Sequence, residues 1–175
     1  MAKAYVLMNC DLGSEKKVIS SLKEIPEVKE AHGTLGLYDI IAKIESDSED
    51  KIKEIVTSQI RKMSNIHSTM TLTRSESEKL FQASEKLITA MLGQNNSQAY
   101  VVIHCDKGEE YNLLKNLSHI SEVKEADVVF GYYDAICKVE APEYKILENV
   151  ITKAIRTLPH VRTSMTLNVI SEQES

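Results

Sequence analysis

The chain has 175 residues, of which 42% are hydrophobic and 27% are charged, and its formal net charge at pH 7 is −5. This length allows one ordinary domain or two small ones, and there is enough apolar material for real cores. A mildly acidic chain is a poor candidate for binding nucleic acid by itself, because such binding uses clustered Lys and Arg to neutralise phosphates.

The first part of the chain predicts six elements in the order β-α-β-β-α-β, which is typical of the ferredoxin-like fold. The strands are short β-rich runs, and the helices carry apolar residues at helical spacing. The predicted elements are a strand at 4–10, a helix that follows the turn at 11–14 and ends at Pro26, strands at 28–35 and 38–45, a helix opening at 47–49, and a strand at 66–73.

Residues 75–98 predict a linker helix followed by a polar connector. Ser75-Glu76-Ser77-Glu78 matches a capping box, and apolar residues follow it at helical spacing. Gln94-Asn95-Asn96-Ser97 then predicts an irregular connection. Such a helix either packs on one of the flanking domains or acts as an oligomerisation arm that docks on another chain.

The chain then repeats itself without a gap at an offset of 95 positions, so that Tyr5 aligns with Tyr100. Glu-Val-Lys-Glu-Ala at 27–31 recurs at 122–126, and Gly-x-Tyr-Asp at 36–39 recurs at 131–134. Duplication of one module is therefore the strongest signal in the sequence. It predicts an α+β protein with two ferredoxin-like domains, 1–74 and 99–171, joined by the linker helix of 75–98, like a fused symmetric dimer.

Strand alternation predicts which side chains face the helices. Both helices of a βαββαβ unit cover one face of its sheet, so the other face needs a different cover. We therefore expect the sheets to pack face to face, within the chain or between chains. In the first strand Val6, Met8 and Cys10 point one way and Tyr5, Leu7 and Asn9 the other, and both sides are largely apolar. The side chains assigned to the helix side are Ile40, Ala42, Ile44, Ile66, Met70 and Leu72, and those assigned to the opposite side include Thr69, Thr71 and Thr73.

Neither a membrane segment nor a disulfide framework is expected. No apolar run approaches the ~20 residues that a membrane helix needs, and the chain's beginning lacks the long apolar stretch of a signal peptide. The three cysteines, Cys10, Cys105 and Cys137, are too few and odd in number for a disulfide scaffold. We expect a cytoplasmic protein with free thiols.

The motifs and their spacing resemble the ligand-binding domain of the Lrp/AsnC family, also called the RAM domain. The shared features are Ala-Tyr-Val in the first strand, Glu-Val-x-Glu in the second, Gly-x-Tyr-Asp at the hairpin, Ile-Arg at the end of the second helix, and Thr-x-Thr in the last strand. The resemblance covers both units. Most members carry a helix-turn-helix domain first, but the first strand here begins at Ala4, so the chain resembles the stand-alone form and is not expected to bind DNA directly.

The resemblance implies a regulatory protein that senses a small molecule. Its ligand would be a free amino acid or similar metabolite, it would form a homo-oligomer (a dimer or a higher ring), and its partner would be a DNA-binding Lrp/AsnC paralogue. The chain shows no nucleophile–base pairing, phosphate loop or dinucleotide fingerprint, so neither an enzyme nor a cofactor is expected. Two alternatives stay open, a structural oligomerisation module with vestigial pockets and a cysteine-based metal or redox sensor.

The resemblance also implies ligand-binding residues in both units. The Asp after the Tyr would approach the ligand's amino group, and loop backbone and strand hydroxyls would take its carboxylate. The alternative is that the glycines permit a turn, the Asp satisfies its backbone and the Thr residues are β-formers. The positions are Gly36, Tyr38, Asp39, Thr69 and Thr71 in the first unit, and Gly131, Tyr133, Asp134, Ser164 and Thr166 in the second.

The two units differ in the residues before the hairpin glycine. Val128-Val129-Phe130 in the second unit replaces Gly33-Thr34-Leu35 in the first, so the two pockets could differ in ligand. His104, Cys105 and Asp106 have the chemistry of a metal or redox site. Because His104 and Cys105 are adjacent in a strand, their side chains point to opposite faces, and no metal site is expected.

Overall fold

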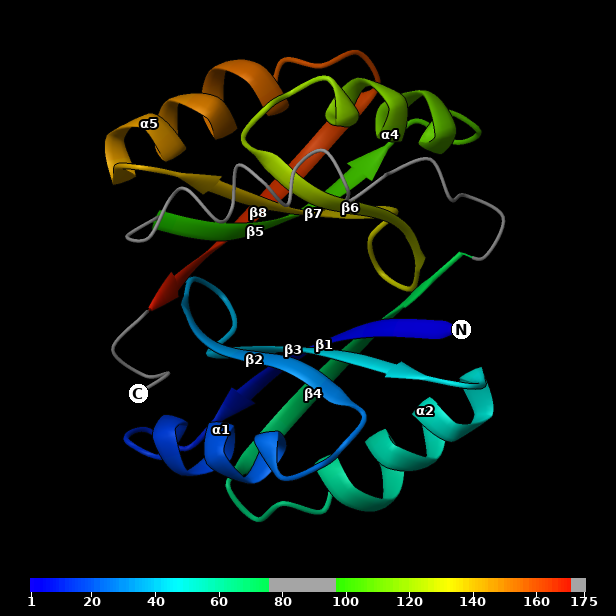
Figure 1. The fold of residues 1–175 in the computed structure, drawn as a ribbon, viewed down its shortest axis with the longest axis vertical. Helices are drawn as coiled ribbons and strands as arrows, with labels where there is room; N and C mark the ends of the chain where they lie inside the picture. Colours follow the sequence, from blue (N-terminus) through cyan, green and yellow to red (C-terminus); the bar gives the residue numbers. More distant parts are fainter. Residues whose placement is uncertain (76–96, 171–175) are drawn as a thin grey trace. The chain divides into compact units, whose positions relative to one another are not determined.

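The structure is a computed structural model that describes residues 1–75 and 97–170 (Figure 1). Almost the whole of the predicted linker helix lies outside these residues. The chain divides into two compact units, made mainly of Met1–Arg74 and Ser75–Asn168. Each unit has the predicted β-α-β-β-α-β order.

The first unit contains four strands and two helices close to the predicted positions. Its N-terminal strand is two residues longer than predicted, and the third strand starts two residues later. The elements are β1 (Ala2–Cys10), α1 (Glu15–Lys23), β2 (Val28–Leu35), β3 (Ile40–Ser46), α2 (Glu49–Ile55), the π-helical turn η1 (Val56–Ile60) and β4 (Ile66–Arg74). Ser48 begins α2, since its Oγ accepts a hydrogen bond of 3.2 Å from the Lys51 N–H.

The second unit repeats the first element by element. Its elements are β5 (Ser97–Cys105), α4 (Glu110–Ser118), β6 (Val123–Phe130), β7 (Ala135–Ala141), α5 (Tyr144–Asn149), the π-helical turn η2 (Val150–Ile155) and β8 (Val161–Ile170). In both units a glycine with positive φ follows the first strand, Gly13 at 84° and Gly108 at 87°. These turns need glycine because other residues rarely adopt that conformation.

Each unit has an antiparallel sheet with both helices on one face (Figure 1). In the first sheet β1 lies between β3 and β4, and β2 pairs with the other side of β3. In the second sheet β5 lies between β7 and β8, and β6 pairs with β7. The strand before the hairpin and the final strand are thus the two outer strands of each four-stranded set.

The core of each unit lies between the sheet and its helices. The predicted inward residues of the third strand, Ile40, Ala42 and Ile44, are confirmed, because they belong to one buried cluster with residues of α1 and α2. Val6 and Met8 of the first strand belong to the same cluster. The residues of α1 in this cluster are Val18, Ile19 and Leu22. The equivalent cluster of the second unit includes Leu113, Leu114 and Leu117 of α4.

The predicted faces of the last strand are wrong beyond Ile66. Thr69, Thr71 and Thr73 pair with Met8, Val6 and Ala4, and residues paired across two strands project to the same face, so these threonines lie on the helix side. Met70 and Leu72 lie on the opposite side. The cause is a β-bulge near the end of β1, where Asn9 pairs with Ser68 but Cys10 pairs with Ile66. A bulge inserts one residue and reverses the alternation.

Among the described residues, none of the helices has the length and apolar character needed to cross a membrane.

Candidate functional site

In both units the second helix ends in a π-helical turn that leads directly into an arginine. The Arg61 N–H donates to the Val56 carbonyl at 2.8 Å, and the Arg156 N–H donates to the Ile151 carbonyl at 3.0 Å. These bonds span five residues rather than four, which widens the helix locally, and π-turns occur frequently at functional sites. The turn sits at the same place in both copies of the repeat and sets the direction of each arginine.

Each arginine reaches the hydroxyls of the last strand on the helix side of the sheet. Arg61 Nε donates to Thr69 Oγ1 at 3.0 Å. Arg156 Nε donates to Ser164 Oγ at 3.0 Å, and its Nη2 lies 3.4 Å from Thr166 Oγ1. The hydroxyl of Thr71 is buried and has no hydrogen-bond partner within the described part of the chain. The β-bulge near the end of the first strand of each unit places these hydroxyls on the helix side, where the arginines reach them.

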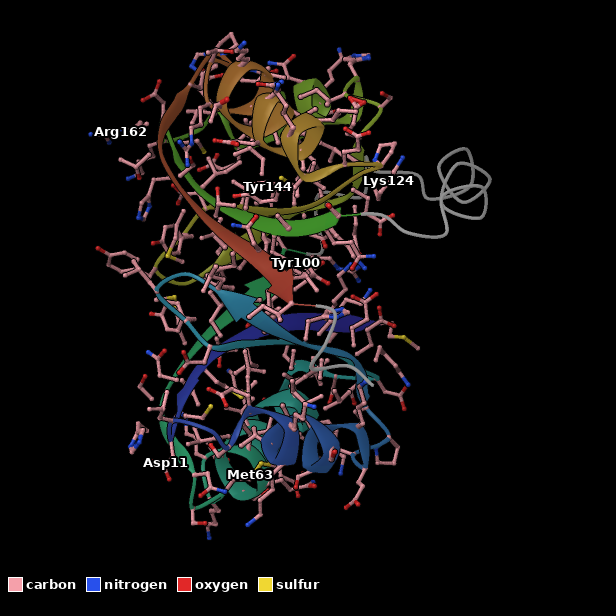
Figure 2. The ribbon with its side chains drawn as sticks, turned by 90° about the vertical axis from the view of Figure 1, so that its left-hand side faces the viewer. Asp11, Met63, Tyr100, Lys124, Tyr144 and Arg162 are labelled. Atoms are coloured by element: carbon pink, nitrogen blue, oxygen red, sulfur yellow. The ribbon has the colours of Figure 1, made fainter. Side chains whose placement is uncertain are left out.

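The second unit has a pocket of about 180 Å³ between its second helix and β8. Ile151 gives it an apolar wall, and Tyr144, at the start of α5, lies on the helix side of the sheet, whereas Tyr100 points to the other side (Figure 2). The pocket is smaller than the roughly 300–1,000 Å³ of sites for drug-sized ligands. The lining residues are Tyr144, Glu148, Ile151, Thr152, Arg156, Thr166 and Asn168.

This lining combines one cation and one anion with several hydroxyl groups. A guanidinium such as that of Arg156 pairs with carboxylates in a fixed forked geometry, and a carboxylate such as that of Glu148 pairs with ammonium groups. The Thr166 hydroxyl can donate to a second carboxylate oxygen. Such a pocket has the right groups for a small zwitterion.

The hairpin aspartates have a structural role in both units. Asp39 Oδ2 accepts a hydrogen bond of 3.0 Å from the Cys10 N–H, and Asp134 Oδ2 accepts one of 2.9 Å from the Cys105 N–H. The Asp39 N–H also donates to the Met8 carbonyl at 2.9 Å. Each aspartate thus fastens the start of one strand to the end of the first strand of its unit. The alternative interpretation of the Gly-x-Tyr-Asp motif placed these carboxylates on the backbone of the turn itself, whereas the observed acceptor bonds are to the first strand of each unit.

A cluster of three rings, His104, Tyr132 and Tyr133, lies beside Asp134 in the second unit. His104 Nδ1 lies 3.7 Å from Asp134 Oδ2, and its ring stacks on Tyr133 with centroids 4.4 Å apart. Tyr132 approaches the same imidazole edge-on at 5.1 Å. The first unit has Asn9 at the position of His104 and a leucine at that of Tyr132. The two hairpins therefore differ chemically although both keep Gly-x-Tyr-Asp.

The predicted site residues fall into two groups in each unit. Thr69, Thr71, Ser164 and Thr166 lie on the helix side near Arg61 and Arg156, whereas the remaining predicted residues form the hairpins. These are Gly36, Tyr38 and Asp39 in the first unit, and Gly131, Tyr133 and Asp134 in the second. The carboxylates of the hairpin aspartates bond to the backbone of the first strand of each unit, whereas the hydroxyls of Thr69, Ser164 and Thr166 bond to the arginines.

Glu148, Thr152 and Tyr144 were not predicted from the sequence as site residues. The sequence feature that could have identified them is their spacing: positions 144, 148, 152 and 156 are four residues apart and share one face of the second helix. Because the last strand of the first unit was assigned to the wrong face, nothing in the pattern connected this helix face to the equivalent strand hydroxyls of the second unit.

The cysteines lack the features of reactive thiols. Cys10, Cys105 and Cys137 are all buried. Burial raises the pKa of the Cys105 thiol from 9.0 to about 12, and nearby carboxylates, Asp134 first, add to the increase. Burial also raises the pKa of Cys10. A thiolate is the form that binds metals, and in the described ranges no group of three or more His, Cys, Asp or Glu side chains is arranged to hold a metal ion.

Several solved structures are similar to this chain. The crystal structure of FFRP-DM1 is 39% identical over 43% of this chain and 100% of that chain, with a TM-score of 0.42. A hypothetical protein from Pyrococcus horikoshii is also 39% identical, over 43% of this chain and 90% of that one, with a TM-score of 0.42. The siroheme decarboxylase NirDL, at 8% identity and a TM-score of 0.67 over 95% of this chain and 70% of that one, shares the fold alone.

No curated protein matches the sequence. The sequence model of the Lrp/AsnC ligand binding domain, however, matches residues 3–81 and again residues 98–174. These two matches cover most of the chain and coincide with the two structural units. The chain therefore belongs to the Lrp/AsnC ligand-binding domain family, a family of regulatory proteins, and carries that domain twice.

Proposed function

We propose that this protein is a regulator that senses a free amino acid and acts by changing its assembly. The observation that supports this most directly is the pocket between α5, η2 and β8, where Arg156 and Glu148 offer opposite charges to one small ligand. An amino acid carries a carboxylate and an ammonium group on one carbon atom. Its two charges match the two charged side chains of the pocket.

The regulatory step would be a shift between assemblies. A ligand changes an equilibrium only through its different affinities for the two states, and the pocket lies beside an outer strand of its four-stranded sheet. The partner would be another copy of the chain or a DNA-binding member of the same family. With its net charge of −5, the chain is proposed to act on DNA only through such a partner. It would bind its ligand without transforming it.

The test is a thermal-shift screen of the full chain with each of the twenty amino acids, followed by light scattering with any amino acid that binds. A ligand at about 100 times its dissociation constant adds about 2.7 kcal/mol to the free energy of unfolding. Arg156→Gln should abolish the shift. Arg162→Gln is the matched control, because Arg162 lies on β8 and its side chain is 69% exposed.

The result that contradicts the proposal is a chain that no amino acid stabilises. The protein would then be an assembly module with vestigial pockets. A stabilising amino acid whose effect survives Arg156→Gln but not Asp134→Asn would move the ligand from the pocket to the hairpin.

A further inference from the structure

The pocket of the second unit and the equivalent positions of the first unit carry different charges. The pocket is called the second groove below. The first groove denotes the equivalent positions in the repeat, Glu49, Lys53, Val56, Thr57, Arg61, Thr71 and Thr73. The position of Glu148 in the second unit is Lys53 in the first, whereas Arg156 corresponds to Arg61. Glu49 stands at the position of Tyr144. The charged groups of the second groove therefore balance, and the first groove has one more cation than it has anions.

The backbone places Lys53 and Glu148 at equivalent points. Thr57 Oγ1 donates to the Lys53 carbonyl at 2.8 Å, and Thr152 Oγ1 donates to the Glu148 carbonyl at 2.9 Å. Each threonine lies four residues after the charged residue, and each is followed four residues later by the arginine of the groove. The side chains of Lys53 and Glu148 thus leave their helices at the same place relative to the guanidinium.

The first groove also contains a polar atom that lacks a partner. Thr71 Oγ1 is buried without a hydrogen bond to any described residue, whereas its counterpart Thr166 lies within reach of Arg156. Arg61 is exposed and is hydrogen-bonded to Thr69. An anionic oxygen bound by Arg61 would give the Thr71 hydroxyl an acceptor, at the place where Thr166 lies 3.4 Å from Arg156 Nη2 in the second unit. A buried hydroxyl gains from such a bond because an unpaired one is destabilising.

We propose that the two repeats recognise different classes of ligand at this groove. The second repeat binds a small zwitterion, with its carboxylate on Arg156 and its ammonium group on Glu148. The first repeat binds a small molecule of net negative charge, a dicarboxylate, with its oxygens on Arg61, Lys53 and the Thr71 hydroxyl. This inference rests on the proposed function, since it takes the groove as the ligand site. One chain would then respond to the concentrations of two ligands, an amino acid and a dicarboxylate.

Charge decides between the two ligands because both grooves offer similar hydroxyls. A zwitterion placed in the first groove would bring its ammonium group to Lys53, a like charge. A dicarboxylate in the second groove would bring its second carboxylate to Glu148, which is also a like charge and would repel it. Both residues are exposed, so solvent screens these interactions, and we expect each mismatch to weaken binding by about ten-fold rather than to abolish it.

The test is isothermal titration calorimetry on the full chain with two kinds of probe, succinate as the anion and each of the twenty amino acids as zwitterions. Lys53→Glu should weaken succinate binding by about ten-fold and leave amino-acid binding unchanged. Glu148→Lys should do the reverse. Lys51→Glu is the matched control for charge, because Lys51 is exposed on the same helix but two residues away, on a different side.

The outcomes separate this inference from the proposed function. If amino acids bind with the expected dependence on Glu148 and Arg156 but succinate does not bind, or binds equally well to Lys53→Glu, the inference is wrong and the proposed function stands. If neither kind of probe binds, both are wrong. Lys53→Gln, which removes the charge without reversing it, should give an intermediate loss of succinate affinity, and circular dichroism of each variant checks that the fold is kept.

Discussion

Replacing Asp134 by Ala should destabilise the junction between β7 and β5. The Asp134 carboxylate accepts the Cys105 N–H at 2.9 Å, and Cys105 is only 5% exposed, so the substitution leaves a buried donor without its partner. A hydrogen bond to a charged group contributes about 1.5–3 kcal/mol. Because the Asp134 side chain is 37% exposed, solvent reduces this contribution, and we expect a loss of about 1–2 kcal/mol.

Amide hydrogen exchange measured by NMR on a sample labelled with ¹⁵N-cysteine would report this loss locally. The chain has three cysteines, so the spectrum contains three backbone signals. In Asp134→Ala the Cys105 amide should exchange about 5- to 30-fold faster, the factor that corresponds to 1–2 kcal/mol. The Cys137 amide, in the central strand β7, serves as the internal reference.

Asp134→Asn should restore most of the protection at Cys105, since the amide oxygen can still accept the bond. The matched variant is Asp39→Ala, which should affect Cys10 and spare Cys105, because Asp39 makes the same bond in the first unit. If Asp134→Ala left the exchange of Cys105 unchanged, the structural role assigned to the hairpin aspartates would be refuted.

Three further predictions concern the core, the thiols and the turns. Leu22→Ala and Leu117→Ala, both at fully buried positions, should each cost about 2–5 kcal/mol in urea unfolding, whereas the fully exposed Leu12→Ala should cost almost nothing. Cys105 should resist a thiol reagent at pH 8, and rapid modification of the native chain would contradict this. The free energy of unfolding should fall as pH rises from about 9 toward 12, because the unfolded thiol loses its proton while the folded thiol, with its raised pKa, keeps it. Gly108→Ala should cost about 1 kcal/mol in thermal unfolding because of its φ of 87°, and an unchanged melting temperature would contradict the turn geometry.

The order and type of the elements could be predicted from the sequence because the chain contains the same pattern of elements twice, once in each unit. A turn signal such as Asp11-Leu12-Gly13 carries more weight when Asp106-Lys107-Gly108 appears at the same place in the repeat. Apolar residues at period two also gave the correct core face of β3, since that strand is regular over the residues concerned. In β1 both faces are largely apolar, so the alternation did not distinguish the core face.

The site was predicted less completely, for a reason that lies in the backbone. The bulge between Asn9 and Cys10 reverses the alternation of β4, and a bulge leaves no residue signature in Ile66–Arg74 that distinguishes it from a regular strand. The threonines were therefore named as ligand residues but assigned to the wrong face. The π-turn before Arg61 was also missed, because Ile52, Ile55 and Ile60 fit an ordinary helix.

The equivalence of the two repeats also poses a problem for folding. Leu7 pairs with Met70 in the first unit, and Val102 pairs with Met165 in the second, in the same register. When the chain is unfolded, β4 can therefore pair with β5 as it would with β1, with few clashes to reject the mistake. Such exchanged pairings are a characteristic failure of repeated domains. The differences between the repeats, among them His104 opposite Thr163 where Asn9 is opposite Ser68, therefore help each strand to select its own partner.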